Sequence, residues 1–368
     1  MQPVPFVDLG RQHATLRAEL DRAVNAVVER GEFILGPAVA RFERQFADYC
    51  GTRHAVGVGS GGSALQLALE ALGVGSGDEV ITVANTFIAT ACAISRTGAT
   101  PVLVDCLDST LGLDTGAVAG AVTPRTRAIV PVHLFGRLAE MEAIAQIATR
   151  HDLPIVEDAA QAHGAARGGR RAGAFGQLAG FSFYPAKNLG AWGDAGAVTT
   201  DDDALAARVR LLRDYGQRAK YEHEIPGENS RLDTLQAAIL GVKLMRLDAW
   251  NDARRRAAAR YRAGLAGTRV VLPAEPDVAE AHVHHLFVVR IADRDRVRAE
   301  LSRQGIQTGI HYPVPVHLHP AYRSLGRGVG SYPIAERAAQ QLLSLPMFAE
   351  ITPEEIDRVC EVLKALVG

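Results

Sequence analysis

LPIVEDAAQAHGA occupies residues 153–165, and FSFYPAKNLGAWGDAG occupies residues 181–196. Each segment begins with a short apolar run and then turns polar or glycine-rich, which is typical of a buried strand that ends at a loop. Asp158 ends the first run, and Lys187 follows the second. If the two strands are parallel, both side chains project from the same edge of one sheet, where open α/β proteins bind their ligands.

Strand-like and helix-like patterns alternate over the surrounding chain. The predicted strands are residues 79–83, 101–105, 128–132, 154–158, 179–183 and 197–200, and the helical patterns between them include residues 63–72 and 141–151. This alternation predicts an α/β fold with a mostly parallel sheet that is covered on both faces. Before it, apolar residues repeat at helical spacing from Leu16 to Val28, and again over residues 39–49 after Gly36-Pro37.

The C-terminal third has a different pattern. A long helical segment is predicted over residues 231–265, followed by a strand at 285–291 and helices at 293–304 and 354–366. We therefore expect a large domain of residues 1–245, including the N-terminal helices, and a smaller α+β domain of residues 246–368. The stretch 312–332 is rich in Pro and Gly and is expected to be an ordered functional loop.

Composition excludes several classes of protein. The 40 Lys and Arg residues nearly balance the 41 Asp and Glu residues, so the basic excess of a nucleic-acid-binding protein is missing. No apolar run approaches the ~20 residues of a membrane helix, and we expect neither a membrane association nor a signal peptide. Four scattered cysteines fit a reducing compartment. We expect a cytoplasmic enzyme.

The segment GVGSGGSALQLALEAL, residues 57–72, contains a glycine-rich loop before a helix. Its glycines match GxGxxG formally, which leaves an NAD-dependent dehydrogenase as one interpretation. A dinucleotide site also needs an acidic residue about 20 positions on, at the end of the next strand, whereas Asp78 and Glu79 precede that strand. Free N–H groups at a helix start nevertheless favour a phosphate site at Gly61, Gly62 and Ser63. The alternative is an ordinary capped helix.

Asp158 and Lys187 above one cleft are either an ion pair or the two essential groups of a pyridoxal 5'-phosphate (PLP) site. PLP needs a lysine for its aldehyde and a carboxylate for its ring nitrogen. It also needs a phosphate site, for which the loop at 59–63 is a candidate, and an aromatic partner for its ring. Phe87, in the segment ANTFIATA, is a candidate for that aromatic partner.

Four segments carry a resemblance to a known family: EDAAQAHGA (157–165), SFYPAKNLGAWGDAGAV (182–198), NSRLDTLQAA (229–238) and HYPVPVHLHPAY (311–322). The chain resembles the DegT/DnrJ/EryC1/StrS family of PLP-dependent sugar aminotransferases, from FVDL at Phe6 to the last helix. YGQRAKYEHE (215–224) followed by GENSRLD (227–233) is similar to the branch that aminates dTDP-linked 3-keto-6-deoxyhexoses. The family usually has Thr-Asp or Met-Asp where this chain has Gly62-Ser63.

The resemblance implies a fold-type I aminotransferase that forms a homodimer with shared active sites. It implies that Lys187 is the Schiff-base lysine and that Asp158 pairs with the ring nitrogen. Further implied cofactor contacts are Gly61, Gly62, Ser63, Phe87, Gln161, Ser182, and Asn229 of the partner subunit. The candidates for sugar or diphosphate contacts are Tyr184, Lys220, Tyr221 and His311.

Most of these residues also have a purely structural interpretation. Phe87 is of a type that usually lies in the core, and Tyr184 is equally suited to packing beneath a cofactor. Gln161 and Ser182 are suited to satisfying backbone groups, and Asn229 is a common turn residue. His282, His284 and His285 cluster in the sequence, as do His311, His317 and His319. No carboxylate or cysteine accompanies them at ligand spacing, so we expect no metal.

The implied reaction moves an amino group from L-glutamate, which leaves as 2-oxoglutarate, to C3 of a nucleotide-linked keto sugar, with pyridoxamine phosphate as the intermediate form of the cofactor. Three alternatives stay open. The first is a C4-specific aminotransferase of the same family. The second is a PLP-dependent sugar dehydratase, which Lys187 argues against because such enzymes have histidine at this position. The third is a non-catalytic regulatory protein that keeps the fold.

Overall fold

A mostly parallel sheet forms the centre of the molecule in the computed structural model, which describes residues 2–367. Its strands are β1 (His54–Val58), β2 (Glu79–Val83), β3 (Thr100–Val104), β4 (Thr126–Val130), β5 (Val156–Asp158), β8 (Leu178–Ser182) and β9 (Gly196–Thr200). Bridges from Ile129 to Ile155 and from Val132 to Asp158 join the order β1-β9-β8-β5 to the order β4-β2-β3. Of these seven strands, β9 runs opposite to the others and pairs antiparallel with both β1 and β8. The predicted α/β class is confirmed.

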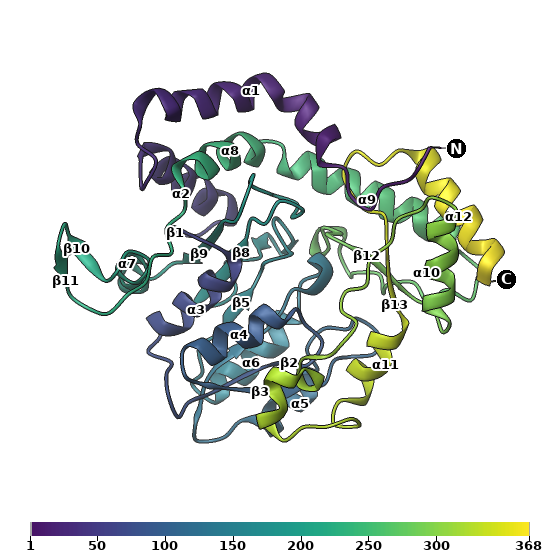
Figure 1. Ribbon diagram of the computed structural model, residues 1–368. Coiled ribbons are helices and arrows are strands. Elements are labelled where there is room, and N and C mark those ends of the chain that lie inside the picture. Colours follow the sequence, from purple (N-terminus) through teal and green to yellow (C-terminus); the bar gives the residue numbers. More distant parts are fainter. Residues whose placement is uncertain (1, 368) are drawn as a thin grey trace.

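Helices cover both faces of this sheet (Figure 1). On one face, α3 (Gly61–Ala71), α4 (Ile88–Arg96) and α7 (Asp203–Leu212) share an apolar core with the strands. On the other face, α2 (Pro37–Cys50) and α8 (Thr234–Leu244) pack near β8 and β9, and α5 (Thr115–Ala121) and α6 (Met141–Arg150) pack near β2 and β4. A two-sided core of this kind is what buried parallel strands require.

The N-terminal helices begin and end where their capping residues direct. Helix α1 (Leu9–Arg30) begins after Asp8, whose carboxylate accepts the Arg11 N–H, and stops at Gly31 with φ of 69°. Pro37 occupies the first turn of α2, where its missing N–H costs nothing. Helix α1 then lies along α8 (Figure 1).

A separate apolar cluster lies at the C-terminal end of the chain. Strand β12 (Phe287–Arg290) pairs antiparallel with β13 (Leu342–Leu345). Helices α9 (Leu247–Gly264), α10 (Arg294–Arg303) and α12 (Pro353–Val367) contribute to this cluster, whereas α11 (Pro333–Gln341) packs on the core of the main sheet. Val4 packs into the same cluster, so the start of the chain lies beside its end (Figure 1). The division into domains at residues 245 and 246 stays a prediction.

The structure corrects one predicted element and adds others. The single helical segment predicted over residues 231–265 is two helices, α8 and α9, separated at Met245 and Arg246. The prediction missed β1, which leads directly into the glycine loop. It also missed two small hairpins, β6 (Ala166–Arg167) with β7 (Arg170–Arg171), and β10 (Gln217–Ala219) with β11 (Glu222–His223). The β10–β11 hairpin extends away from the sheet (Figure 1).

The Pro- and Gly-rich stretch 312–332 contains two short 3-10 helices, Val316–Leu318 and Pro320–Leu325. Between residues 2 and 367, no helix is both long enough and apolar enough to cross a bilayer.

Candidate active site

Two neighbouring parallel strands bring Asp158 and Lys187 to one edge of the sheet. Strands β5 and β8 run in parallel, with Asp158 opposite Gly180. Lys187 lies five residues beyond the end of β8, in a turn where its N–H donates to the Tyr184 carbonyl at 2.8 Å. The two side chains are close enough for each to affect the pKa of the other. The juxtaposition predicted from the sequence is present.

The Asp158 carboxylate is buried and held by two donors. Thr90 Oγ1 donates to Oδ2 at 2.7 Å, and the Ala160 N–H donates to Oδ1 at 3.2 Å. Burial raises the pKa of Asp158, while these donors and the Lys187 ammonium act in the opposite direction. A buried carboxylate with this balance is suited to a cationic N–H partner, which would lower its desolvation cost.

Lys187 has a weakened affinity for its proton. Burial lowers the pKa of its amine to about 8, and the nearby Asp158 carboxylate opposes that shift. At neutral pH about a tenth of such amines are uncharged and able to act as nucleophile or base. Three histidines, His163, His285 and His311, also lie within electrostatic reach of this amine, and burial lowers the pKa of each.

The start of α3 forms a cradle beside the end of β8. Ser60 caps the helix by accepting the Ser63 N–H at 3.1 Å. A Cβ on Gly61 would lie 2.5 Å from Cβ of Ser182, so only glycine allows this approach. The first N–H groups of a helix have no acceptor within the helix. The N–H groups of Gly61 and Gly62, together with the hydroxyls of Ser63 and Ser182, therefore form a site suited to an anion.

Phe87 and Gln161 lie on the same side of the molecule and are linked through Tyr312. Phe87 precedes α4, is 52% exposed, and its ring lies 5.2 Å from that of Tyr312. Gln161 Oε1 accepts the Phe135 N–H at 2.6 Å, and its Nε2 donates to the Tyr312 hydroxyl at 3.0 Å. The exposed ring of Phe87 argues against its core interpretation, whereas Gln161 does satisfy a backbone group.

The candidate substrate residues fall into two groups. Tyr184 is 56% exposed, three residues before Lys187. His311 is held by Ser344, whose Oγ lies 2.8 Å from Nδ1, and burial lowers its pKa to about 4. Lys220 and Tyr221 lie instead at the tip of the β10–β11 hairpin, with Tyr221 80% exposed.

Asn229 is exposed and lies next to a contact with the glycine loop of its own chain. The neighbouring Ser230 carbonyl accepts the Gly59 N–H at 3.1 Å, which places this segment beside the strand that leads into α3. The assignment of Asn229 to the cofactor site of the partner subunit stays a prediction.

Sequence reasoning missed three residues that support the site. Thr90 lies three residues after Phe87 in ANTFIATA, and Tyr312 directly follows His311 in HYPVPVHLHPAY, so closeness in sequence to these candidates was an available signal. Asn188 directly follows Lys187 and is 1% exposed, and its position beside the lysine was the only signal.

The histidine clusters do not form a metal centre in the part of the chain that the structure describes. His282 and His284 stack with ring centroids 3.9 Å apart, and burial lowers the pKa of both. His317 Nε2 donates to Oε1 of Glu336 at 2.9 Å. These rings are part of the packing.

A family model for the DegT/DnrJ/EryC1/StrS aminotransferase family matches residues 14–364. The chain belongs to this family. Among its relatives, the dTDP-3-amino-3,4,6-trideoxy-alpha-D-glucose transaminase of Streptomyces venezuelae is 52% identical over 98% of this chain and 95% of its own.

Solved structures in the same family share the whole fold. The structure of S. venezuelae DesV in complex with a ketimine intermediate has a TM-score of 0.97 and 51% identity, covering 100% of this chain and 99% of DesV. NtdA of Bacillus subtilis, solved with bound cofactor PMP, has a TM-score of 0.93 and 34% identity, covering 100% of this chain and 86% of NtdA. The predicted fold-type I aminotransferase architecture is confirmed.

Proposed function

We propose that this protein is a PLP-dependent aminotransferase that transfers the amino group of L-glutamate to C3 of a dTDP-linked 3-keto-6-deoxyhexose. The observation that carries the proposal is the meeting of Asp158 and a weakly basic Lys187 at one edge of a parallel sheet. Family membership and the 52% identical transaminase support both the class of reaction and the substrate.

The residues present suit PLP. The cradle at Gly61, Gly62, Ser63 and Ser182 offers backbone and hydroxyl donors to a phosphate. The start of α3 lies so close to the end of β8 that a Cβ at Gly61 would clash with Ser182. The cradle therefore faces the end of the strand that precedes Lys187.

The remaining contacts would hold the ring of the cofactor. Asp158 would accept from the ring nitrogen, and the exposed Phe87 ring is available for stacking. Gln161 is positioned by Phe135 and Tyr312, and its remaining Nε2 hydrogen would serve the ring hydroxyl.

Bound PLP would supply an electron sink that stabilises negative charge at the Cα of the amino donor. The Lys187 amine would act as base and acid, because its lowered pKa lets it take a proton from Cα and return it nearby. The Asp158 carboxylate, held by Thr90 and Ala160, would keep the ring nitrogen protonated through both half-reactions.

The same family contains the main alternative, a C4-specific nucleotide-sugar aminotransferase. The 52% identical relative is a transaminase named for a 3-amino sugar, and this favours C3. Lys187 and its lowered pKa disfavour the dehydratase and the non-catalytic interpretations, since neither needs a basic amine at this point.

The proposal includes a homodimer with shared active sites. In it the exposed residues Lys220, Tyr221 and Asn229 would approach the site of the partner. No nucleic-acid partner belongs to the proposal, and the enzyme would work in the cytoplasm.

Product analysis tests the proposal. The protein is incubated with L-glutamate and either dTDP-3-keto- or dTDP-4-keto-6-deoxyhexose, and the amino position is read by NMR. We expect a 3-amino product from the first sugar and no product from the second. A 4-amino product would establish the alternative, and a colourless protein that releases no 2-oxoglutarate would overturn the PLP assignment.

A further inference from the structure

A buried pair of amide side chains connects the two catalytic loops. Asn251, on α9, is 1% exposed, and its Nδ2 donates to the His163 carbonyl at 2.8 Å. Its Oδ1 accepts from Nδ2 of Asn188, also at 2.8 Å. His163 lies in the turn that follows Asp158, and Asn188 directly follows Lys187. One side chain therefore ties the Asp158 loop to the Lys187 loop.

The hydrogen-bond pattern fixes the orientation of both amides. A carbonyl only accepts, so the His163 carbonyl requires Nδ2 of Asn251 on its side, and the Val283 carbonyl, 3.0 Å away, requires Nδ2 of Asn188 on its side. Oδ1 of Asn188 is then left to accept from Nδ1 of His285 at 3.2 Å. His285 consequently carries its proton on Nδ1.

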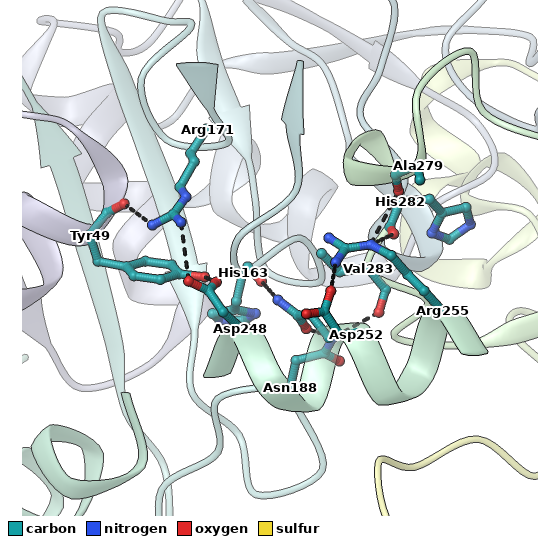
Figure 2. Close-up of polar contacts among 11 residues, drawn as sticks. Tyr49, His163, Arg171, Asn188, Asp248, Asp252, Arg255, Ala279, His282 and Val283 are labelled. Atoms are coloured by element: carbon teal, nitrogen blue, oxygen red, sulfur yellow. Dashed lines mark hydrogen bonds and ion pairs between the residues drawn. The ribbon is translucent and has the colours of Figure 1, made fainter. Parts of the chain in front are cut away.

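Helix α9 is itself anchored at Asp248 and at Arg255, which lie before and after Asn251 in the sequence; Figure 2 shows the contacts of these two anchors. Asp248 accepts the Tyr49 hydroxyl and pairs with Arg171 at 3.2 Å. Three residues beyond Asn251, Arg254 Nη1 donates to the His285 carbonyl at 3.3 Å. The next residue, Arg255, donates from Nε to the His282 carbonyl, also at 3.3 Å. Asn251 therefore reaches the catalytic loops from a fixed support.

The backbone at Gly164 packs closely against the side chains of Asn251 and Tyr49. A Cβ on Gly164 would lie 2.8 Å from Nδ2 of Asn251 and 2.2 Å from the Tyr49 hydroxyl, and Gly164 has φ of 87°. In Figure 2, Asn188, His163 and Val283 converge on the same turn of the helix.

We propose that Asn251 is a positioning residue that, through His163 and Asn188, holds the Asp158 loop and the Lys187 loop at one separation and keeps Lys187 away from water. The inference rests on the proposed function, in which Asp158 and Lys187 must act on the same cofactor. The groups that face Lys187 are Asp158, His163, His285 and His311. Two of these four, His163 and His285, belong to segments that the amide pair holds.

The test reads the Lys187 amine directly. Pulse labelling of lysines at a series of pH values, with mass spectrometry of the peptide that contains Lys187, gives the pKa of that amine in the pyridoxamine form of the enzyme. The variants are Asn251→Ala and the milder Asn251→Ser, so that a folded variant is available. The matched control is Tyr261→Phe, on the same helix, which removes a buried hydrogen bond to the Pro346 carbonyl.

We expect the Asn251 variants to raise the Lys187 pKa by ~1 unit, because water would enter the loosened loop and weaken the desolvation that lowers it. Tyr261→Phe should lower the Tm and leave the Lys187 pKa unchanged. An unchanged Lys187 pKa in the Asn251 variants, or an equal shift in Tyr261→Phe, would overturn the inference. The Lys187 amine is free for labelling both in the pyridoxamine form and in the cofactor-free protein, so a wild-type protein that takes up no PLP would refute the proposed function alone.

Discussion

At the scale of single residues, Lys187 and Lys243 have similarly lowered pKa values but different surroundings. Lys187 is partly exposed, whereas Lys243 is buried. Burial lowers the pKa of both Lys187 and Lys243 to about 8. Lys187 faces Asp158, whereas Lys243 donates to the Gly190 carbonyl at 2.6 Å and contacts His13 at 3.2 Å. Only the first is placed for chemistry at the sheet edge.

Borohydride reduction of the PLP-loaded protein should therefore attach the cofactor to Lys187 and not to Lys243, as read by peptide mass spectrometry. Lys187→Ala should reduce turnover by at least ~10³-fold, since it removes the group that transfers the proton. Lys243→Met, the matched control, should keep the visible absorbance of the bound cofactor. Modification at Lys243 would contradict the assignment of roles.

His163 gives the stability of the protein a pH dependence. It is fully buried, and burial lowers its pKa to about 3, against about 6.5 in an unfolded chain. Between these pH values the unfolded state binds a proton that the folded state does not. Stability is therefore lost as pH falls below about 6.5, by up to about 2 kcal/mol at pH 5 from this residue.

His163→Phe should remove that part of the pH dependence. The ring lies among Phe181 and Phe183, with centroids 5.5 and 5.6 Å away, so an aromatic replacement suits the surroundings. Urea unfolding at pH 7 and pH 5 should show a smaller difference for the variant than for the wild type. Equal differences would mean that His163 is already protonated in the fold.

At the scale of elements, alanine variants at the start of α3 test whether the cradle holds the phosphate. Gly61→Ala would drive a Cβ to 2.5 Å from Ser182, whereas a Cβ on Gly62 meets nothing closer than Ser60 Oγ at 3.8 Å. Gly61→Ala should weaken PLP retention by at least ~10-fold, because α3 must move away from β8. Gly62→Ala should keep the cofactor and gain up to about 1 kcal/mol of helix stability.

Absorbance of the cofactor after dialysis separates the two glycine variants. Wild-type retention by Gly61→Ala would show that the cradle does not hold the phosphate.

The elements themselves were largely predictable, because buried strands and amphipathic helices each leave a periodic pattern. Residues 79–83, for example, form β2 as predicted. Strand β1 was missed because His54–Val58 merges into the glycine loop, which drew attention to the helix instead. The break between α8 and α9 was missed because Met245 and Arg246 are good helix formers, and tertiary packing ends the helix there.

The site was predictable only as far as local motifs reach. Asp158 ends a recognisable strand and Lys187 follows another, and parallel pairing of the two strands then brings them together. Asn251 has no such signal: it lies in an arginine-rich helix, 63 residues from Asn188, and only the tertiary fold joins the two. Likewise, serine is a good N-cap residue at either position 60 or position 63, and the geometry of the turn makes Ser60 the cap of α3.

At the scale of the whole molecule, shared active sites would make the dimer the functional unit. Lys187→Ala and Asn229→Ala should each be poorly active alone. If Asn229 serves the partner's site, a hybrid dimer contains one intact site and one doubly altered site. Random mixing after mild unfolding should then restore about a quarter of wild-type activity.

The size of the recovery distinguishes the two arrangements. If Asn229 serves its own chain, every site in the mixture has one defect, and no activity beyond that of the separate variants should return.

The central claim is that this chain carries an amino group on its cofactor from glutamate to a 3-keto sugar. The most direct measurement converts the pure protein to its pyridoxamine form with L-glutamate, removes the donor, adds freshly generated dTDP-3-keto-6-deoxyhexose and records the visible spectrum. The account predicts that the absorbance of lysine-bound PLP returns as a 3-amino sugar forms, and that the 4-keto isomer gives no return. A spectrum that stays in the pyridoxamine form with the 3-keto sugar would contradict it.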